Sequence, residues 1–540
     1  MFEIIARFGK YKVPVRVDAD GAALILTFPY FDKLVDEVKG MDLIPPGWDA
    51  ANKCWRVKNC KRNLFTIQVW TGKGAIERYD APIKDHISFE HTFWGHQVDM
   101  FNFIMSRHRC ILAAEMRTGK TYPSLKAVET VGAHTWWVAP KSALRGLQNE
   151  LKKRDFRGNL KLITYDSFAT MVHGEQFTDV PKFLVFDEMQ KLKNPTSKRG
   201  EAARIISELM EDEYKGEEYV VGLSGTPAPR DPSDWWNLAE VTRPGWLRES
   251  SQAKLLKRLA VMEQQEGQVG QIYLKNTGWK QDEVAYLYKR LSGLVLVKLK
   301  KDCLDLPPKS YDVRTLVCSA KVKLICRTIV NQETSILQAT QKLRQLSDGF
   351  LYENEADECG KMHRVGTKFI GTPKLDELTQ DIEEHEDIGR LVVYAGFQGS
   401  VDLITEKFVS LGWIVLQIDG RGWKVFGEHT TEECIDAMDR SLDTGAIERL
   451  AVVAQSDSAG TGLEFSATPT VIYYSNSDSG DARMQSEDRP YSNNMDTQRG
   501  LRIIDYCYLP TDAKMLARLK EKKDLQSLTL GELKKEVENV

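Results

Sequence analysis

The chain has 540 residues, of which 42% are hydrophobic and 28% charged, and its formal net charge is −3. The length predicts several domains, the composition is that of an ordinary globular protein, and the net charge excludes a generally basic nucleic-acid coat while leaving local basic stripes possible. The nine cysteines form no C-x-x-C pair, so we expect reduced thiols, and Cys359 with His363 offers too few ligands for a structural zinc site. Because apolar residues nowhere run together for about 18 positions, neither a signal peptide nor a membrane span is expected.

Residues 1–80 are predicted to form a small α+β domain. The stretches "YKVPVRV" and "AALILTF" are strand-like and flank the turn sequence "DADG". In "YFDKLVDEVKGM", Phe31, Leu34, Val35 and Val38 share one helical face. A last strand in "KCWRVK" is expected to close the domain.

Residues 85–245 change to short apolar runs that alternate with helical segments. The runs "RCILAAE", "HTWWVAP", "LKLITYD", "KFLVFDE" and "YVVGLSG" are typical of parallel strands buried on both faces, so a doubly wound α/β domain is predicted. Trp235 and Trp236 are expected to pack in its core. A helical stretch of low apolar periodicity follows from about Glu249 to Arg290.

A second α/β set is predicted over residues 311–510, because "RLVVYAGF", "WIVLQIDG", "LAVVAQS" and "TVIYYSN" are again buried-strand runs. Residues 246–310 are assigned to a helical insert and linker, and residues 511–540 to a charged helical tail. The predicted fold class is therefore α/β, with two tandem doubly wound parallel sheets, a small α+β domain and a helical insert.

The spacing from Ala114 to Thr121 fits a phosphate-binding loop, with alanine in place of the first glycine. Lys120 would neutralise phosphates and Thr121 would ligate Mg²⁺. Arg117 stands where glycine is usual, so an ordinary negative φ is expected there. The motif follows a strand and precedes a helix, which favours a nucleotide site.

A pair of carboxylates ends the strand "FLVFDE". ATP hydrolysis needs such a pair, with Asp187 holding the metal and Glu188 polarising the attacking water. The alternative, that the two residues only begin a loop, is weakened by "GLSGTP" at the end of the next strand.

These motifs, in this order, resemble those of the Swi/Snf-like ATPases within helicase superfamily two. "DEMQKLKN" and "LSGTP" are similar to motifs II and III, Gln97 to the adenine-reading Q motif, "WVAPKSAL" and "ITYDSF" to motifs Ia and Ib, and "LVLVKLKKDCLDLPPK" to the segment that links the lobes. In the second set, "VYAGFQGSVDLI" resembles motif IV, "SAGTGLEFSAT" motif V and "QSEDRPY" the start of motif VI. The resemblance implies RecA-like lobes.

The resemblance also implies ATP and Mg²⁺ as cofactors and assigns roles to individual residues. Catalysis is expected at Lys120, Asp187, Glu188 and the arginine finger Arg489; nucleotide contacts at Gln97, Thr118, Gly119, Lys120, Thr121 and Gln485; metal ligation at Thr121 and Asp187; DNA contacts at Lys141, Ser142, Thr164, Gly460 and Thr461; and coupling at Gln190, Ser224 and Thr226. Ser492 departs from the pattern, because a second arginine is usual there. Arg499 and Arg502 are weaker candidates for that charge, and the alternative is that both are only solvated surface residues. Gln190 stands where histidine is common.

The N-terminal stretch resembles the HARP domain of annealing-type members of this family. Lys53, Arg56 and Lys58, followed by Lys61 and Arg62, make a basic run without acidic residues, interleaved with Trp55 and Phe65. Such a run could bind DNA by phosphate contact and stacking. The alternative is a solvated strand with a core tryptophan.

The leading hypothesis is an ATP-dependent translocase on double-stranded DNA that anneals or remodels forked or branched DNA in replication, recombination or repair. A strand-separating helicase and an ATP-gated DNA-binding switch with weak turnover are the alternatives. Single-stranded DNA or its binding protein is a further expected partner. We expect a monomer without membrane contact, in the cytoplasm of a bacterial or phage-infected cell.

Overall fold

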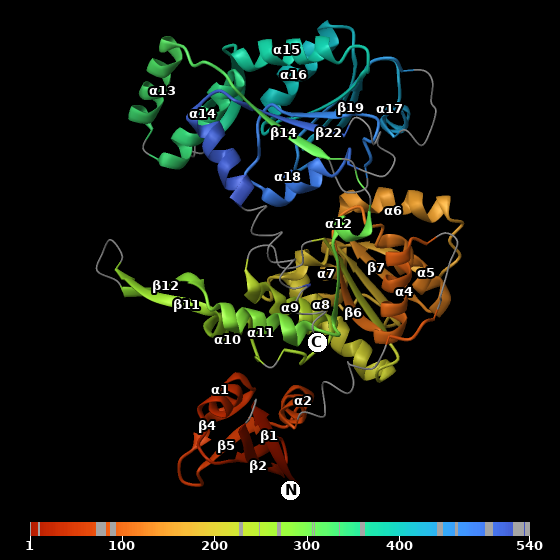
Figure 1. Cartoon of the computed structure of the whole chain (residues 1–540), viewed down its shortest axis with the longest axis vertical. Helices are drawn as coiled ribbons and strands as arrows, with labels where there is room; N and C mark the ends of the chain where they lie inside the picture. Colours follow the sequence, from red (N-terminus) through yellow and green to blue (C-terminus); the bar gives the residue numbers. More distant parts are fainter. Residues whose placement is uncertain are drawn as a thin grey trace. The chain divides into compact units, whose positions relative to one another are not determined.

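The structure, a computed structural model of the whole chain, contains two compact units (Figure 1). The first comprises Met1–Cys303 with Gln526–Val540, and the second comprises Leu304–Leu525. The structure describes all residues except 1, 9–10, 72–82, 87–92, 226–230, 248, 267–271, 305, 307, 334, 357–361, 440–446, 459–462, 492–499, 522–533 and 535–540.

The N-terminal domain of the first unit contains an antiparallel sheet with the strand order β1-β2-β3-β5-β4. Its elements are β1 (Phe2–Phe8), β2 (Tyr11–Asp20), β3 (Ala23–Thr27), α1 (Asp32–Gly40), β4 (Leu43–Asp49), β5 (Cys54–Lys58) and α2 (Lys61–Trp70). Along β2, Val13, Val15 and Val17 are buried and the residues between them are exposed, the alternation of a sheet with one face on the core.

The two helices of this domain complete its core. Helix α1 buries Leu34, Val35 and Val38, as its spacing predicts. The strand β5 was predicted to be the last element of the domain, but helix α2 follows it. Helix α2 buries Ile67 and Trp70 in the same core. These two residues are three apart and so share one face of the helix, a spacing that the basic residues before them obscure in the sequence.

The first α/β lobe contains a six-stranded parallel sheet with the order β13-β6-β10-β9-β7-β8. Its strands are β6 (Arg109–Ala114), β7 (Thr135–Ala139), β8 (Leu160–Thr164), β9 (Phe183–Asp187), β10 (Tyr219–Ser224) and β13 (Val295–Lys298). Its helices are α4 (Gly95–Arg107), α5 (Thr121–Val131), α6 (Lys141–Lys153), α7 (Tyr165–His173), α8 (Lys198–Tyr214) and α9 (Trp235–Thr242), with short 3₁₀ helices η1 (Met189–Leu192) and η2 (Pro232–Asp234).

Helices cover both faces of this sheet, so its strands are apolar throughout, as predicted. Helices α4, α5 and α6 share one core with alternate strand residues such as Leu112 and Val185. Helices α7, α8 and α9 share the other core with Ile111 and Phe186. Trp235 lies in that second core and is 1% exposed, which confirms its predicted packing role.

The insert after this lobe is helical only at its ends. Helices α10 (Gln252–Leu259) and α11 (Gln281–Leu291) flank an antiparallel hairpin of β11 (Ala260–Glu266) and β12 (Ile272–Trp279). The prediction of helix across this whole stretch is wrong for the hairpin, whose low apolar periodicity is that of an exposed strand pair and not of a helix. After α11 the chain enters β13 and the short helix α12 (Lys300–Cys303).

The second unit contains a seven-stranded sheet with the order β14-β22-β21-β17-β20-β18-β19, parallel except for the edge strand β19. Its strands are β14 (Lys309–Thr315), β17 (Arg390–Tyr394), β18 (Ile414–Asp419), β19 (Gly422–Phe426), β20 (Leu450–Ala454), β21 (Thr470–Tyr473) and β22 (Leu501–Cys507). Its helices are α13 (Ala320–Gln332), α14 (Ile336–Asp348), α15 (Pro373–Glu384), α16 (Gln398–Ser410), α17 (Thr431–Met438) and α18 (Gly480–Glu487).

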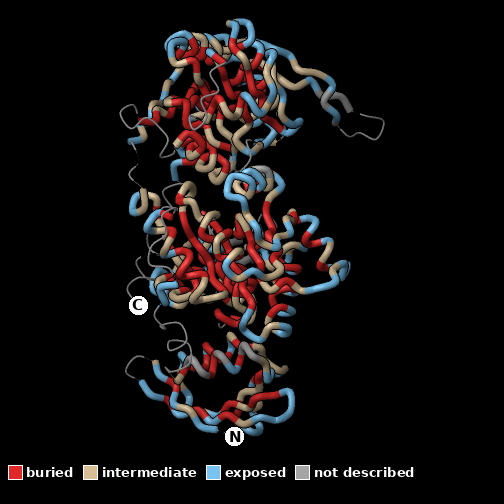
Figure 2. The backbone as a smooth tube through the Cα atoms, turned by 90° about the vertical axis from the view of Figure 1, so that its right-hand side faces the viewer, coloured by how far each residue is buried: buried red, intermediate tan, exposed pale blue. Residues whose placement is uncertain are grey.

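The core of the second unit again lies on both faces of its sheet, and Figure 2 shows the buried positions along the strands of each unit. The units are thus tandem RecA-like α/β lobes, which confirms the predicted fold class. A second hairpin, β15 (Phe350–Ala356) with β16 (Met362–Phe369), was not predicted. Residues 511–521 of the predicted helical tail are helical.

Candidate nucleotide-binding site

The predicted phosphate-binding loop joins β6 to the first turn of α5. Two of its residues adopt positive φ, Arg117 at 68° and Gly119 at 69°. The expectation of a negative φ for Arg117 is therefore wrong: the turn requires the left-handed conformation where glycine is usual, and arginine adopts it at a cost of about 1–2 kcal/mol. At Gly119 a Cβ atom would lie 2.3 Å from Nε2 of Gln97, so a side chain there would displace the Gln97 amide from the loop.

Gln97 and His96, at the start of α4, hold this loop in place. Oε1 of Gln97 accepts a hydrogen bond from the Trp94 N–H at 3.0 Å, and its Nε2 donates to the Gly119 carbonyl at 3.1 Å. His96 Nε2 donates to the Thr118 carbonyl at 2.8 Å, and burial lowers the pKa of His96. Gln97 thus contacts the loop directly.

The carboxylate pair lies at the carboxyl end of β9, two strands from β6 in the sheet. The Tyr165 hydroxyl donates to the Asp187 carbonyl at 2.8 Å, and the Glu188 N–H donates to the Asp187 carboxylate at 3.0 Å. Burial, together with the charge of Glu188, raises the pKa of Asp187 to about 6, and the charge of Lys120 opposes that rise. The loop lysine and the carboxylates therefore act on each other at one edge of the sheet.

A hydrogen-bonded chain connects this pair to the end of β10. Gln190 Nε2 donates to Glu188 Oε2 at 2.6 Å, and the Ser224 hydroxyl donates to Gln190 Oε1 at 2.6 Å. Gln190 thus uses its amide as donor on one side and acceptor on the other. Thr226, the other predicted coupling residue, lies outside the described residues.

The hard oxygen donors at this edge fit a divalent cation such as Mg²⁺. Thr121 begins α5 directly after Lys120, and Asp187 contributes a carboxylate whose raised pKa a bound cation would lower. Thr118 instead turns inward, with its hydroxyl donating to the Glu115 carbonyl at 2.8 Å.

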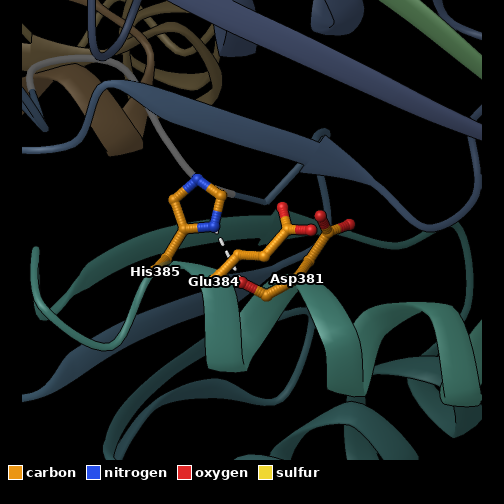
Figure 3. Close-up of side chains that lie close together, drawn as sticks. All are labelled: Asp381, Glu384 and His385. Atoms are coloured by element: carbon orange, nitrogen blue, oxygen red, sulfur yellow. Dashed lines mark hydrogen bonds between the residues drawn. The ribbon is translucent and has the colours of Figure 1, made fainter.

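Another group of metal-type ligands, Asp381, Glu384 and His385, lies at the end of α15 in the second unit (Figure 3). Both ring nitrogens of His385 have protein partners, the Asp381 carbonyl at 2.7 Å and the Thr470 hydroxyl at 2.8 Å. The Asp381 carboxylate pairs with Arg314 at 2.9 Å and accepts a hydrogen bond from Tyr506. These contacts explain the cluster as part of the packing of the second unit.

The predicted motif VI stretch begins on helix α18, which holds Gln485, and continues past the end of the helix to Arg489. Gln485 is half-buried. Arg489 is 7% exposed, and its Nη1 donates to the Leu463 carbonyl at 3.2 Å. Arg502, one candidate for the missing second cation, pairs with Asp312 at 2.9 Å. The other candidate Arg499, the departing residue Ser492 and the predicted DNA contacts Gly460 and Thr461 fall outside the described part of the chain.

The sequence analysis missed Arg483, which anchors α18. Its guanidinium donates to Asp505 at 2.6 and 2.9 Å, to Glu487 at 2.8 Å and to Asn476 at 2.5 Å. It also lies 3.3 Å from the centre of the Tyr473 ring. The available signal was Glu487 four residues later on the same helical face.

The predicted DNA contacts of the first unit occupy two places. Lys141 is exposed at the start of α6, Ser142 follows it, and Thr164 caps α7 by accepting a hydrogen bond from the Ser167 N–H at 3.2 Å. Both helices follow strand ends at the same edge of the sheet as Asp187, because all these strands are parallel.

The basic run of the N-terminal domain extends from the residue before β5 to the start of α2. Lys53 and Lys58 are exposed and Arg56 is half-buried. Trp48 and Trp55 pair across β4 and β5 with ring centres 5.3 Å apart. In the described part of the chain no helix is long and apolar enough to cross a membrane.

No family model matches the sequence. The chain is similar to the CHD3-type chromatin-remodeling factor CHR7 of Arabidopsis thaliana, with 22% identity over 435 residues, which cover 71% of this chain and 33% of that protein. The chain thus spans about a third of that relative's length. Among solved structures it is similar to the SWI2/SNF2 ATPase core of Sulfolobus solfataricus in complex with dsDNA, with 19% identity, a TM-score of 0.35 and coverage of 84% of this chain and 96% of that chain. At these identities the fold class rests on the sheet order of each unit.

Proposed function

We propose that the chain is a Swi/Snf-like, DNA-dependent ATPase that uses ATP hydrolysis to move along double-stranded DNA. The observation that carries this proposal is the continuous arrangement at one sheet edge: Lys120, the Asp187 and Glu188 carboxylates, and the hydrogen-bonded chain through Gln190 to Ser224. The relative that is 22% identical is named a chromatin-remodeling factor, which supports the proposal.

In this proposal the residues act on the nucleotide in distinct ways. The amide groups at the start of α5 and the Lys120 ammonium group bind phosphates. Glu188, 6% exposed and oriented by Gln190, polarises the attacking water. Thr121 and Asp187 would hold Mg²⁺, which neutralises phosphate charge when bound. Arg489 stabilises the charge of the transition state.

The coupling to DNA is proposed to run through the chain from Glu188 to Ser224. Helices α6 and α7 begin at the same sheet edge. In this proposal Lys141, Ser142 and Thr164 bind phosphates of a duplex without reading bases. A shift of α6 or α7 on DNA binding would then change the position of Glu188 through the hydrogen-bonded groups at this sheet edge.

The test is ATP hydrolysis by the full chain with duplex, single-stranded or no DNA. We expect duplex DNA to stimulate hydrolysis, and Lys120→Ala and Glu188→Gln to abolish the stimulated rate. Lys126→Ala, a lysine on the same helix α5, is the matched control. Preference for single-stranded DNA with strand displacement would establish the helicase instead, and ATP-dependent binding without turnover would establish the switch.

The finer proposal is that the protein anneals or remodels forked DNA, with the N-terminal domain directing it to the fork. The exposed Lys53 and Lys58 beside the Trp48 and Trp55 pair support it. The triple substitution of Lys53, Arg56 and Lys58 by alanine should slow annealing of a fork while leaving duplex-stimulated hydrolysis intact. Equal annealing by the variant would contradict it.

A further inference from the structure

A cavity of about 980 Å³ lies within the first unit, between the N-terminal domain and the insert of the first lobe. Residues of β1, β2 and α1 line it on one side, and residues of α10 and α11 on the other. Its volume lies at the upper end of the range of about 300–1,000 Å³ that is typical of ligand sites. Neither the nucleotide site nor the basic run on β5 contributes to it.

A buried charge cluster around Arg258 holds the two walls together. Nη1 of Arg258 on α10 lies 3.2 Å from the carboxylates of both Glu37 on α1 and Glu249. Its Nε lies 2.8 Å from Glu283 on α11. Burial of Arg258 opposes its charge, but the carboxylates outweigh burial and raise the pKa of Arg258. Arg258 thus joins the two walls by an ion pair with Glu37 of the N-terminal domain.

Backbone contacts join the walls beside this cluster. The Ser250 N–H donates to the Gly40 carbonyl at 2.9 Å, and Lys254 Nζ donates to the Met41 carbonyl at 3.1 Å. Both acceptors lie at the end of α1. The cavity is therefore a built feature of the first unit, with defined contacts on either side.

The cavity carries a modest excess of positive charge. Seven basic side chains and five carboxylates line it. Lys33, Lys39 and Lys257 are exposed, and within the described ranges of the chain no ion pair engages them. Because these lysines stand on both walls, the lining suits a ligand with several phosphates spaced along it.

Aromatic rings accompany these charges. Tyr11 is 51% exposed and lines the wall formed by the N-terminal domain, and Tyr286 is 36% exposed on α11. The Tyr11 ring lies 5.6 Å from that of Phe31, which supports it from behind. Exposed rings beside lysines are the combination that binds unpaired bases and their phosphates, whereas a duplex keeps its base faces stacked inside.

We propose that this cavity binds a short segment of single-stranded DNA, with Lys33, Lys39 and Lys257 on its phosphates and Tyr11 stacked on a base. The inference rests on the proposed DNA motor and adds a second nucleic-acid site to it. Since the lysines come from both walls, a bound strand bridges the N-terminal domain and the lobe that binds nucleotide.

The first test measures the affinity of the full chain for a fluorescent oligothymidylate and for a duplex of equal length. The variant with Lys33, Lys39 and Lys257 changed to alanine should bind the single strand about tenfold more weakly. Each phosphate contact contributes about 0.7 to the slope of log affinity against log salt, so the loss of three contacts should reduce the magnitude of this slope by about 2. The variant with Lys289, Lys321 and Lys323 changed to alanine loses the same charge away from the cavity and should bind normally. Equal losses in the two variants would overturn the proposal.

The second test separates stacking from charge. Tyr11→Ala should weaken single-strand binding at least about fivefold, Tyr11→Phe should restore it, and duplex binding should change in neither. Tyr30→Ala, at an exposed tyrosine outside the cavity, is the control. Failure of Tyr11→Ala to weaken binding would overturn the stacking contact.

A competition experiment identifies the occupant. In the Lys120→Ala background, ATP should not displace the oligothymidylate, and displacement would show a mononucleotide site and overturn the proposal. Absence of duplex-stimulated hydrolysis in the unmodified chain would instead defeat the proposed motor function, and the binding measurements would still report on the cavity.

Discussion

Charged side chains are held in opposite ways at the end of β9 in the first unit, where Asp187 and Glu188 lie, and on helix α18 of the second unit. Asp187 is half-buried beside another carboxylate, and burial together with the charge of Glu188 raises its pKa to about 6. Arg483 on α18 is more deeply buried but is paired with Asp505 and Glu487. The first region therefore holds negative charge that a cationic ligand would relieve, whereas the second has satisfied its charge within the fold. The region around Asp187 is suited to a cationic ligand, whereas the ion pairs of Arg483 fix the position of helix α18.

The largest effect expected from this comparison is at Arg489, which lies two residues after the end of α18. If it is the arginine finger, Arg489→Ala should lower the DNA-stimulated rate of ATP hydrolysis by about 10³-fold or more. Steady-state turnover with duplex DNA measures it.

Arg502→Ala is the matched control, because Arg502 is an arginine of the same unit whose partner Asp312 is on the surface. It should retain turnover within about threefold. Unchanged turnover in Arg489→Ala would remove the finger assignment, and a large loss in Arg502→Ala would transfer it.

The next effect is on stability and tests the satisfied charge of α18. Arg483→Met leaves the carboxylates of Asp505 and Glu487 buried without their cation, and should lower the free energy of unfolding by about 3–5 kcal/mol. Denaturant unfolding followed by circular dichroism measures it. Arg449→Met removes an exposed ion pair with Glu386 and should cost at most about 1 kcal/mol. Similar losses in the two variants would show that the buried pairing contributes nothing special.

A smaller effect is expected at Gln190, which connects the nucleotide edge to β10. Gln190→Ala removes hydrogen bonds to Glu188 and Ser224 worth about 1 kcal/mol each. Stimulation by DNA should fall about tenfold while hydrolysis without DNA stays within about threefold. Gln190→His should restore coupling, because neutral histidine also offers one donor and one acceptor. Full stimulation in Gln190→Ala would show that DNA acts by another route.

The same two regions show what the sequence could predict. Strand runs such as "KFLVFDE" predicted both the sheet and the place of Asp187, because parallel strands end at one edge and apolar runs mark buried strands. The anchoring of α18 was not predictable, since Asp505 lies on β22, 22 residues from Arg483, and only the sheet order brings them together. The β11–β12 hairpin was missed for a related reason: its strands are stabilised by pairing and not by an apolar periodicity. The cavity lined by Lys33 and Lys257 combines residues more than 200 positions apart in the chain.

The smallest effect is expected at Arg117, where the sequence predicted a negative backbone φ and the structure has a positive one. With φ at 68°, Arg117→Gly relieves about 1–2 kcal/mol of strain, and the greater freedom of glycine in the unfolded chain cancels about 0.4–1 kcal/mol of that gain. Stability should therefore rise by about 1 kcal/mol or less, and ATP hydrolysis should stay within about twofold. Lys215→Gly, at another non-glycine residue with positive φ (51°), should give the same stability change. A collapse of hydrolysis in Arg117→Gly alone would show that the arginine side chain itself contacts the nucleotide, and the strained angle would then serve to aim that side chain.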